Sequence, residues 1–181
     1  VFEELGVLKG VHDSNMSLKN SSKYNFYESL DKLIEEVDGL VICTPADTHF
    51  DIAKKAIKKT DILVEKPLAL KTAEVKKLIE MEKKYKHLIM TGHQLHFHPA
   101  ILKMKKLIDS DEIGKIKWIY SNRLNMGKIR PYENVLWSFA PHDISLMIDF
   151  VNSEIINIDV QGTKITNSKI EDTSLTLFEF K

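Results

Sequence analysis

The chain has 181 residues, enough for one good core or for two small domains that share an interface. Its 26 Lys and Arg residues balance its 26 Asp and Glu residues, so the basic footprint of a nucleic-acid-binding protein is absent. No apolar stretch approaches the roughly 18–20 residues that span a bilayer, and no basic-then-apolar leader is visible, so we expect a soluble, cytoplasmic protein without a membrane partner.

The first half of the chain alternates short apolar runs with helical patterns. Residues 1–5, followed by Gly6, have the composition of the last turn of a helix and its C-terminal glycine, which suggests that the first element is cut. We expect strands at 7–11, 40–43, 61–64 and 88–90, and helices over 27–37, after a cap at Asp47 and Thr48, and over 72–85. This alternation predicts an α/β fold with a partial Rossmann-type, doubly wound parallel sheet over residues 1–91.

The strand expected at 40–43 is apolar on both sides, as in a parallel sheet that helices cover on both faces. It contains the only cysteine, Cys43, which we expect to be a buried thiol that packs as a small hydrophobe. A single cysteine also excludes an intramolecular disulfide framework and any multi-cysteine zinc site.

The pattern changes after residue 91. A helix is predicted over 99–108, and strict alternation at 115–125, 155–160 and 173–180 predicts strands with one exposed face. Such strands form antiparallel sheets, so residues 92–181 are expected to form an incomplete α+β domain with a mostly antiparallel, open-faced sheet.

Two places in the first half could bind a ligand. Asp13 follows the first expected strand, where an acidic residue of a dinucleotide-binding unit accepts hydrogen bonds from the adenosine ribose and repels the extra phosphate of NADP. Glu65-Lys66-Pro67 follows the strand at 61–64, at the sheet edge where open α/β sheets bind ligands. Pro67 would stiffen that turn and can be cis. Taken alone, each place is better explained by exposed loop residues.

Together, Thr44-Pro45, His49 and Glu65-Lys66-Pro67 resemble the Gfo/Idh/MocA oxidoreductase family, over nearly the whole chain. The resemblance implies a nicotinamide cofactor, NAD rather than NADP given Asp13. It also implies that Thr44, Pro45 and His49 line the nicotinamide side of the cleft, that Glu65 lies beside the cofactor, and that Lys66 contacts the substrate hydroxyl that loses hydride.

The segment from Ser121 to Leu146 is similar to the branch of that family that oxidises C3 of nucleotide-linked N-acetyl sugars. The resemblance implies that His142 is the catalytic base and that Lys66 stabilises the developing alkoxide. Many family members place an aspartate four residues before this histidine, whereas this chain has Ser138. Charged and amide side chains before the histidine would suit a diphosphate or carboxylate of the substrate: Arg123, Asn125, Lys128 and Arg130.

Three histidines, His93, His96 and His98, could in principle bind zinc, but no carboxylate or cysteine completes a recognised spacing. The resemblance instead implies an interdomain crossover whose polar side chains face the substrate cleft, so no metal is expected. Two rival functions stay open: a free sugar or inositol-type polyol dehydrogenase, and a non-catalytic cofactor-sensing regulator.

The resemblance further implies that the glycine-rich phosphate loop precedes Val1, so this chain by itself is expected to bind NAD poorly. It also implies a homo-oligomer when the protein is full length, paired through the open face of the second sheet. The small-molecule partner is then a nucleotide sugar or a sugar.

Overall fold

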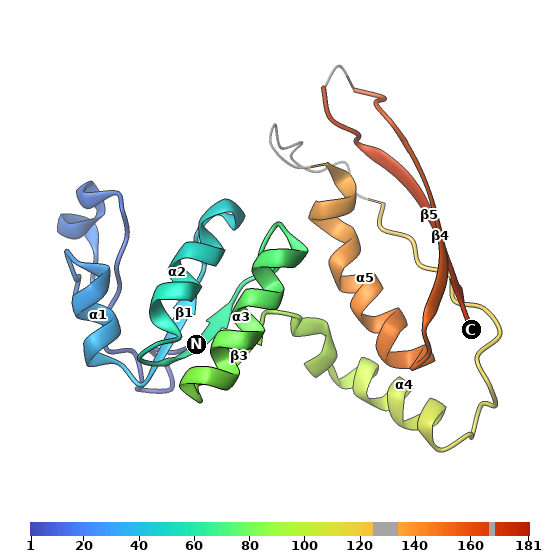
Figure 1. Cartoon of the computed structure of the whole chain (residues 1–181), viewed down its shortest axis with the longest axis horizontal. Coiled ribbons are helices and arrows are strands. Elements are labelled where there is room, and N and C mark those ends of the chain that lie inside the picture. The colour runs from blue at the N-terminus through green and yellow to red at the C-terminus, as the bar shows by residue number, and fades with distance from the viewer. Residues whose placement is uncertain (125–133, 167–168) are drawn as a thin grey trace. The chain divides into compact units, whose positions relative to one another are not determined.

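The computed structural model describes residues 1–124, 134–166 and 169–181. The chain divides into two compact units, Val1–Gly92 and His93–Lys181 (Figure 1).

The first unit is built on a parallel three-stranded sheet. Its strands are β1 (Gly39–Ile42), β2 (Asp61–Val64) and β3 (Ile89–Thr91), in the spatial order β1-β2-β3. Helices α2 (His49–Ala56) and α3 (Thr72–Tyr85) connect them, as parallel neighbours require. The strand predicted at 61–64 is confirmed, and those at 40–43 and 88–90 are shifted by one residue.

The core of this unit lies on one face of the sheet. Leu40, Ile42, Ile62 and Val64 are buried, and they pack with buried residues of the helices: Leu33, Ile34, Ala53, Ala56, Ile57, Leu78 and Met81. Val41 points the other way and is 37% exposed. The expectation that both faces of β1 are covered is therefore wrong for this chain.

The segment before α1 (Leu30–Glu36) is more extended than predicted. Of residues 7–11, only Val11 is bridged, through hydrogen bonds with Asn25 and Tyr27, so the expected strand is reduced to an isolated pair. Because that pairing engages the Tyr27 amide and the backbone is still extended at Ser29, the helix predicted from residue 27 begins three residues later. A short 3₁₀ helix, η1 (Met16–Ser21), precedes this region. Residues 1–6 form hydrogen-bonded turns that end at Gly6 with a φ of +69°.

The helix caps differ from expectation. A 3₁₀ turn, η2 (Ala46–Thr48), precedes α2. The Thr48 side chain makes no capping hydrogen bond to the first turn of α2. Its hydroxyl bonds to Thr44 and Pro45 instead, which is why the predicted cap is wrong. Helix α3 has the predicted bounds, and it buries Leu78 and Met81, whereas Ile79 is 43% exposed.

The second unit contains η3 (Gln94–Phe97), α4 (Pro99–Asp109), α5 (Val135–Val151), β4 (Ile155–Thr163) and β5 (Thr173–Phe180). The two strands pair antiparallel into a long hairpin, and Figure 1 shows this hairpin running beside α5. The predicted helix at 99–108 and the predicted strands at 155–160 and 173–180 are confirmed, β4 being three residues longer.

The strand predicted from residue 115 is wrong. Residues 115–124 form no strand, because alternation only sorts side chains to two faces, whereas a strand also needs a hydrogen-bonded neighbour. Trp118 and Tyr120 are 73% and 74% exposed. Helix α5 begins seven residues before His142, where Asn134 accepts a hydrogen bond from the Trp137 amide, and it continues through Pro141.

Candidate functional site

The carboxyl ends of the three parallel strands lie along one edge of the first sheet, the edge at which open α/β sheets bind ligands. Here the Glu65 amide donates to Ile42 O at 2.9 Å, and the Gly92 amide donates to Val64 O at 2.7 Å. A Cβ on Gly92 would lie only 3.2 Å from Glu65 Oε2, so the chain after β3 passes directly beside Glu65. The residues following β1, β2 and β3 are therefore held close together.

His49 lies behind this edge and joins two of its turns. The side chain is 1% exposed, with Nδ1 2.7 Å from the Pro67 carbonyl oxygen and Nε2 2.8 Å from the Thr44 carbonyl oxygen. The Lys66–Pro67 peptide bond is cis. Both ring nitrogens face protein carbonyls, which leaves neither of them for a cofactor.

Thr44 and Pro45 are exposed in front of His49. Thr48 Oγ1 lies 2.7 Å from both Thr44 Oγ1 and Pro45 O. A hydroxyl has one hydrogen to donate, so Thr48 satisfies the Pro45 carbonyl when the Thr44 hydroxyl donates to Thr48. Thr44 then keeps acceptor capacity toward a ligand.

Cys43 departs from its prediction, because its side chain is exposed rather than buried. Partial burial and, second, the negative charge of Glu65 raise the pKa of the Cys43 thiol. The thiolate is the nucleophilic form, so Cys43 is a poor nucleophile at neutral pH.

Asp13 is exposed two residues after the Val11 bridge. Its Oδ1 accepts a hydrogen bond from the Asn15 amide at 2.8 Å, which closes a local turn. The carboxylate is thus fixed in direction at the surface, as a ribose contact would require.

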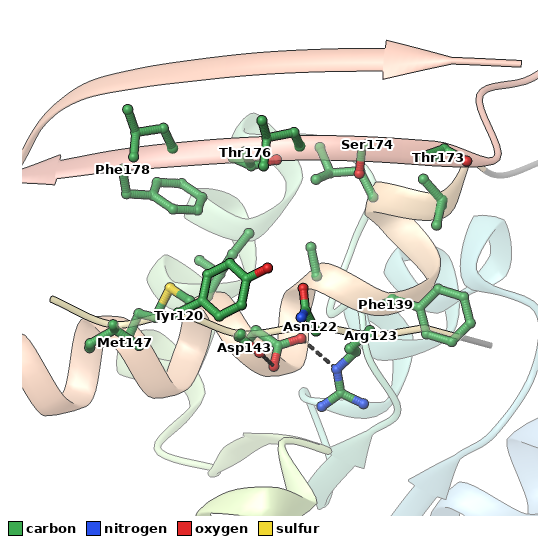
Figure 2. Close-up of a pocket in the computed structure, with 18 of the residues that line it drawn as sticks. Tyr120, Asn122, Arg123, Phe139, Asp143, Met147, Thr173, Ser174, Thr176 and Phe178 are labelled. Carbon is green, nitrogen blue, oxygen red and sulfur yellow. Dashed lines mark hydrogen bonds and ion pairs between the residues drawn. The ribbon is translucent and has the colours of Figure 1, made fainter.

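In the second unit, Asp143 joins α5 to the segment 116–124. Ser121 Oγ donates to Asp143 Oδ1 at 2.8 Å, and Arg123 Nε pairs with Asp143 Oδ2, as Figure 2 shows. The charge of Arg123, predicted to bind substrate, is therefore already balanced by a carboxylate. Sequence reasoning missed Asp143, although an acid next to a candidate base and one arginine in the preceding strand-like segment could have indicated it.

A cavity of about 1050 Å³ separates this segment from β5. Its walls include Tyr120 and Asn122 on one side and Thr176 and Phe178 on the other, over a floor on α5 that includes Met147 (Figure 2). Ser138 and Asp143 line it, whereas His142 does not. The candidate base therefore faces another side of the helix.

The side of α5 that faces away from the cavity contacts η3. His96 Nδ1 lies 3.7 Å from Asp149 Oδ2, and Asp149 is seven residues after His142, so the two share one stripe of α5. The His93 ring packs edge-on against His96. Burial, and then the charge of His96, lower the pKa of His93, which keeps its imidazole neutral near pH 7. The histidines of the crossover thus reach the helix that carries the candidate base.

The third histidine, His98, caps α4 by accepting a hydrogen bond from the Ala100 amide. In the part of the chain that the structure describes, no three His, Cys, Asp or Glu side chains converge as metal ligands would. Over the same residues, no helix is long and apolar enough to cross a membrane. Asn125, Lys128 and Arg130, predicted to contact substrate, lie outside the described residues.

Residues 6–93 match the sequence model of the Gfo/Idh/MocA group, described as an oxidoreductase family with an NAD-binding Rossmann fold. Among curated proteins, the chain is 28% identical over 177 residues to the UDP-N-acetylglucosamine 3-dehydrogenase of Acidithiobacillus ferrooxidans, covering 94% of this chain and 55% of that protein. It is 30% identical over 165 residues to an inositol 2-dehydrogenase/D-chiro-inositol 3-dehydrogenase of Lactiplantibacillus plantarum, covering 86% and 47%. The chain thus spans about half the length of these relatives.

The solved structure of the Acidithiobacillus ferrooxidans UDP-N-acetylglucosamine 3-dehydrogenase superposes with a TM-score of 0.84 at 26% identity. The superposition covers 96% of this chain and 56% of that one. The likeness therefore extends beyond residue 93, through the α5 and hairpin region.

Proposed function

Since residues 6–93 of this chain belong to the oxidoreductase family with an NAD-binding Rossmann fold, we propose that the protein is an NAD-dependent dehydrogenase of a nucleotide-linked N-acetyl sugar, oxidising a ring hydroxyl, C3 by analogy. The observation that carries the proposal is the compact edge at the ends of β1, β2 and β3, where the Glu65 amide donates to Ile42 O and the Gly92 amide donates to Val64 O.

The residues at hand fit a nicotinamide cofactor. Thr44 and Pro45 are exposed at the carboxyl edge of the sheet, and the exposed Asp13 carboxylate, held by its turn, could accept hydrogen bonds from a ribose. A carboxylate there would repel the 2′-phosphate of NADP, which favours NAD. The Cys43 thiol, with its raised pKa, adds no competing negative charge at this edge.

In the proposed reaction, Lys66 binds the substrate hydroxyl and stabilises negative charge as it develops on the oxygen. His142 accepts the hydroxyl proton on its imidazole, and the carbinol carbon becomes a ketone. When bound, the nicotinamide supplies the acceptor for the two electrons and the hydrogen that leave that carbon as hydride.

The proposed substrate class rests on the relative that covers 94% of this chain, which is a UDP-N-acetylglucosamine 3-dehydrogenase. Arg123, Asn125 and Arg130 would serve the diphosphate. Because Arg123 pairs with Asp143, we propose that it contributes through the remaining N–H groups of its guanidinium, which has five donors.

The test is NADH formation by the protein expressed from its native reading frame, with UDP-N-acetylglucosamine and with myo-inositol as substrates. We expect turnover of the nucleotide sugar, and a loss of about 10²–10⁴-fold in kcat for His142→Asn, the range for removing a general base. Lys66→Met is expected to lose about 10²–10³-fold, the range for removing one oxyanion donor. Wild-type kcat in both variants would refute the assigned roles.

The inositol dehydrogenase that is 30% identical over 86% of the chain supports a second candidate, a polyol dehydrogenase of the same family. Turnover of myo-inositol without turnover of the nucleotide sugar would favour it, as would indifference to Arg123→Gln. Cofactor binding without turnover of any sugar would instead favour a cofactor-sensing regulator.

A further inference from the structure

His49 makes two hydrogen-bonding contacts that reach two separate turns of the sheet edge. Nδ1 contacts the carbonyl of Pro67, the residue after Lys66, and Nε2 contacts the carbonyl of Thr44, the residue before Pro45. The side chain is 1% exposed, so both of its nitrogens are shielded from water. An imidazole that carries a hydrogen on each nitrogen donates to both carbonyls, and in that form this one side chain holds both turns.

The contact between His49 and Pro67 restrains the backbone next to Lys66. A lysine side chain has four rotatable bonds, so the position of its ammonium depends first on where its backbone is held. The amide of Glu65 is fixed by Ile42 O on one side of Lys66, and the carbonyl of Pro67 is fixed by His49 on the other. The histidine therefore completes the support of the backbone at Lys66.

The contact between His49 and Thr44 restrains the turn after β1. Thr44 and Pro45 are also tied by the hydroxyl of Thr48, which directly precedes His49 in the chain. The start of α2 thus presents one hydroxyl and one imidazole to the turn after β1, and the same imidazole to the turn after β2. These two contacts can be removed separately.

We propose that His49 is a positioning residue that acts through two arms: the Nδ1 arm holds the Lys66–Pro67 turn for the chemical step, and the Nε2 arm holds the Thr44–Pro45 turn for cofactor binding. The inference rests on the proposed function. The inference goes beyond the proposed function by assigning the two arms different kinetic effects.

Asparagine and glutamine separate the arms. The Asn amide nitrogen is as many bonds from Cα as Nδ1, and the Gln amide nitrogen as many as Nε2, so His49→Asn keeps the Pro67 arm and His49→Gln keeps the Thr44 arm. His49→Leu removes both. Thr60→Val is the matched control, because Thr60 is equally buried, at 1%, but lies before β2 at the opposite end of that strand.

In the protein expressed from its native reading frame, we expect His49→Gln to lower kcat about 10–100-fold, the range for a small misplacement of a catalytic group, with an unchanged KM for NAD. His49→Asn is expected to keep kcat and to raise the KM for NAD. Thr60→Val should change neither constant.

The same kinetic profile for the Asn and Gln variants, or unchanged constants in both, would overturn the inference. If His49→Leu does not fold, the Asn and Gln variants still decide, since each keeps one bond. Lys66→Met serves as the reference: if it keeps full kcat, the proposed function fails, whereas loss in Lys66→Met with no effect at His49 refutes only the positioning role.

Discussion

The two units of this chain differ in how their apolar residues are covered. In the first unit, twelve apolar residues with 7% exposure or less are packed mostly between one face of the sheet and its helices. In the described part of the second unit, only Leu146 and Phe150 are comparably buried, while the hairpin exposes large apolar side chains: Ile156, Ile158, Val160, Leu175 and Leu177. The first unit has a closed core, and the second has an apolar surface.

The difference indicates that different interactions stabilise the two units. Burial of apolar area stabilises the first unit directly. In the second, the contacts between segments depend more on polar and charged bonds, such as those of Asp143 and Asp172. Local stability in a protein follows such differences in buried contacts.

The largest expected effect is in the closed core. Leu78→Ala removes a side chain with 0% exposure, and we expect it to destabilise the first unit by about 2–5 kcal/mol, the range for such cavities. Leu177→Ala makes the same change on β5, where the side chain is 48% exposed, and should cost about 0.5 kcal/mol or less. Urea unfolding with hydrogen exchange resolved by unit measures both. Equal costs would contradict the contrast between the units.

The next effect concerns the link between the segment 116–124 and α5. Asp143→Asn removes the charge that pairs with Arg123, and we expect a loss of about 1–2 kcal/mol, below the upper range for charged hydrogen bonds because Arg123 is partly exposed. A double-mutant cycle with Arg123→Gln should show a coupling of about 1 kcal/mol. Simple additivity of the two substitutions would show that the ion pair adds no stability.

The smallest effect is acid sensitivity at the β4–β5 hairpin. Asp172 accepts hydrogen bonds from the amides of Ile165 and Thr166 and from the Thr166 hydroxyl, which lower its pKa from 3.8 to about 2. A lowered folded-state pKa stabilises the hairpin above about pH 4, and this stabilisation is lost as pH falls toward 2. Amide NMR of Ile165 and Thr166 should follow that titration, and Asp172→Asn should abolish it. A midpoint near 3.8 would contradict the bonding.

The first sheet was largely predictable from sequence because a buried strand leaves a signature in its own residues. Ile62 and Val64 are buried where the apolar run predicted β2, and Thr72–Tyr85 has the bounds that helical spacing gave. Residues 115–124 alternate as clearly, but the hydrogen-bonded neighbour that defines a strand is a property of other residues.

The sequence predicted which residues form the candidate site better than it predicted which groups those residues bond to. The Thr44-Pro45 and Glu65-Lys66-Pro67 turns follow β1 and β2 as the strand pattern indicated. That the imidazole of His49 contacts the Pro67 carbonyl, and that Arg123 already pairs with Asp143, depends on side-chain geometry between segments 18 to 20 residues apart, which spacing alone does not encode.

Cys43 can be used to detect a ligand bound at the end of β1. It is the only thiol of the chain, it is exposed one residue before Thr44, and the charge of Glu65 contributes to its raised pKa. Alkylating reagents attack the thiolate, so labelling near pH 7 should be slow and should accelerate if that carboxylate is neutralised. A bound dinucleotide that shields this end of β1 would slow it further, which makes the rate of thiol modification a reporter of occupancy that requires neither turnover nor a known sugar.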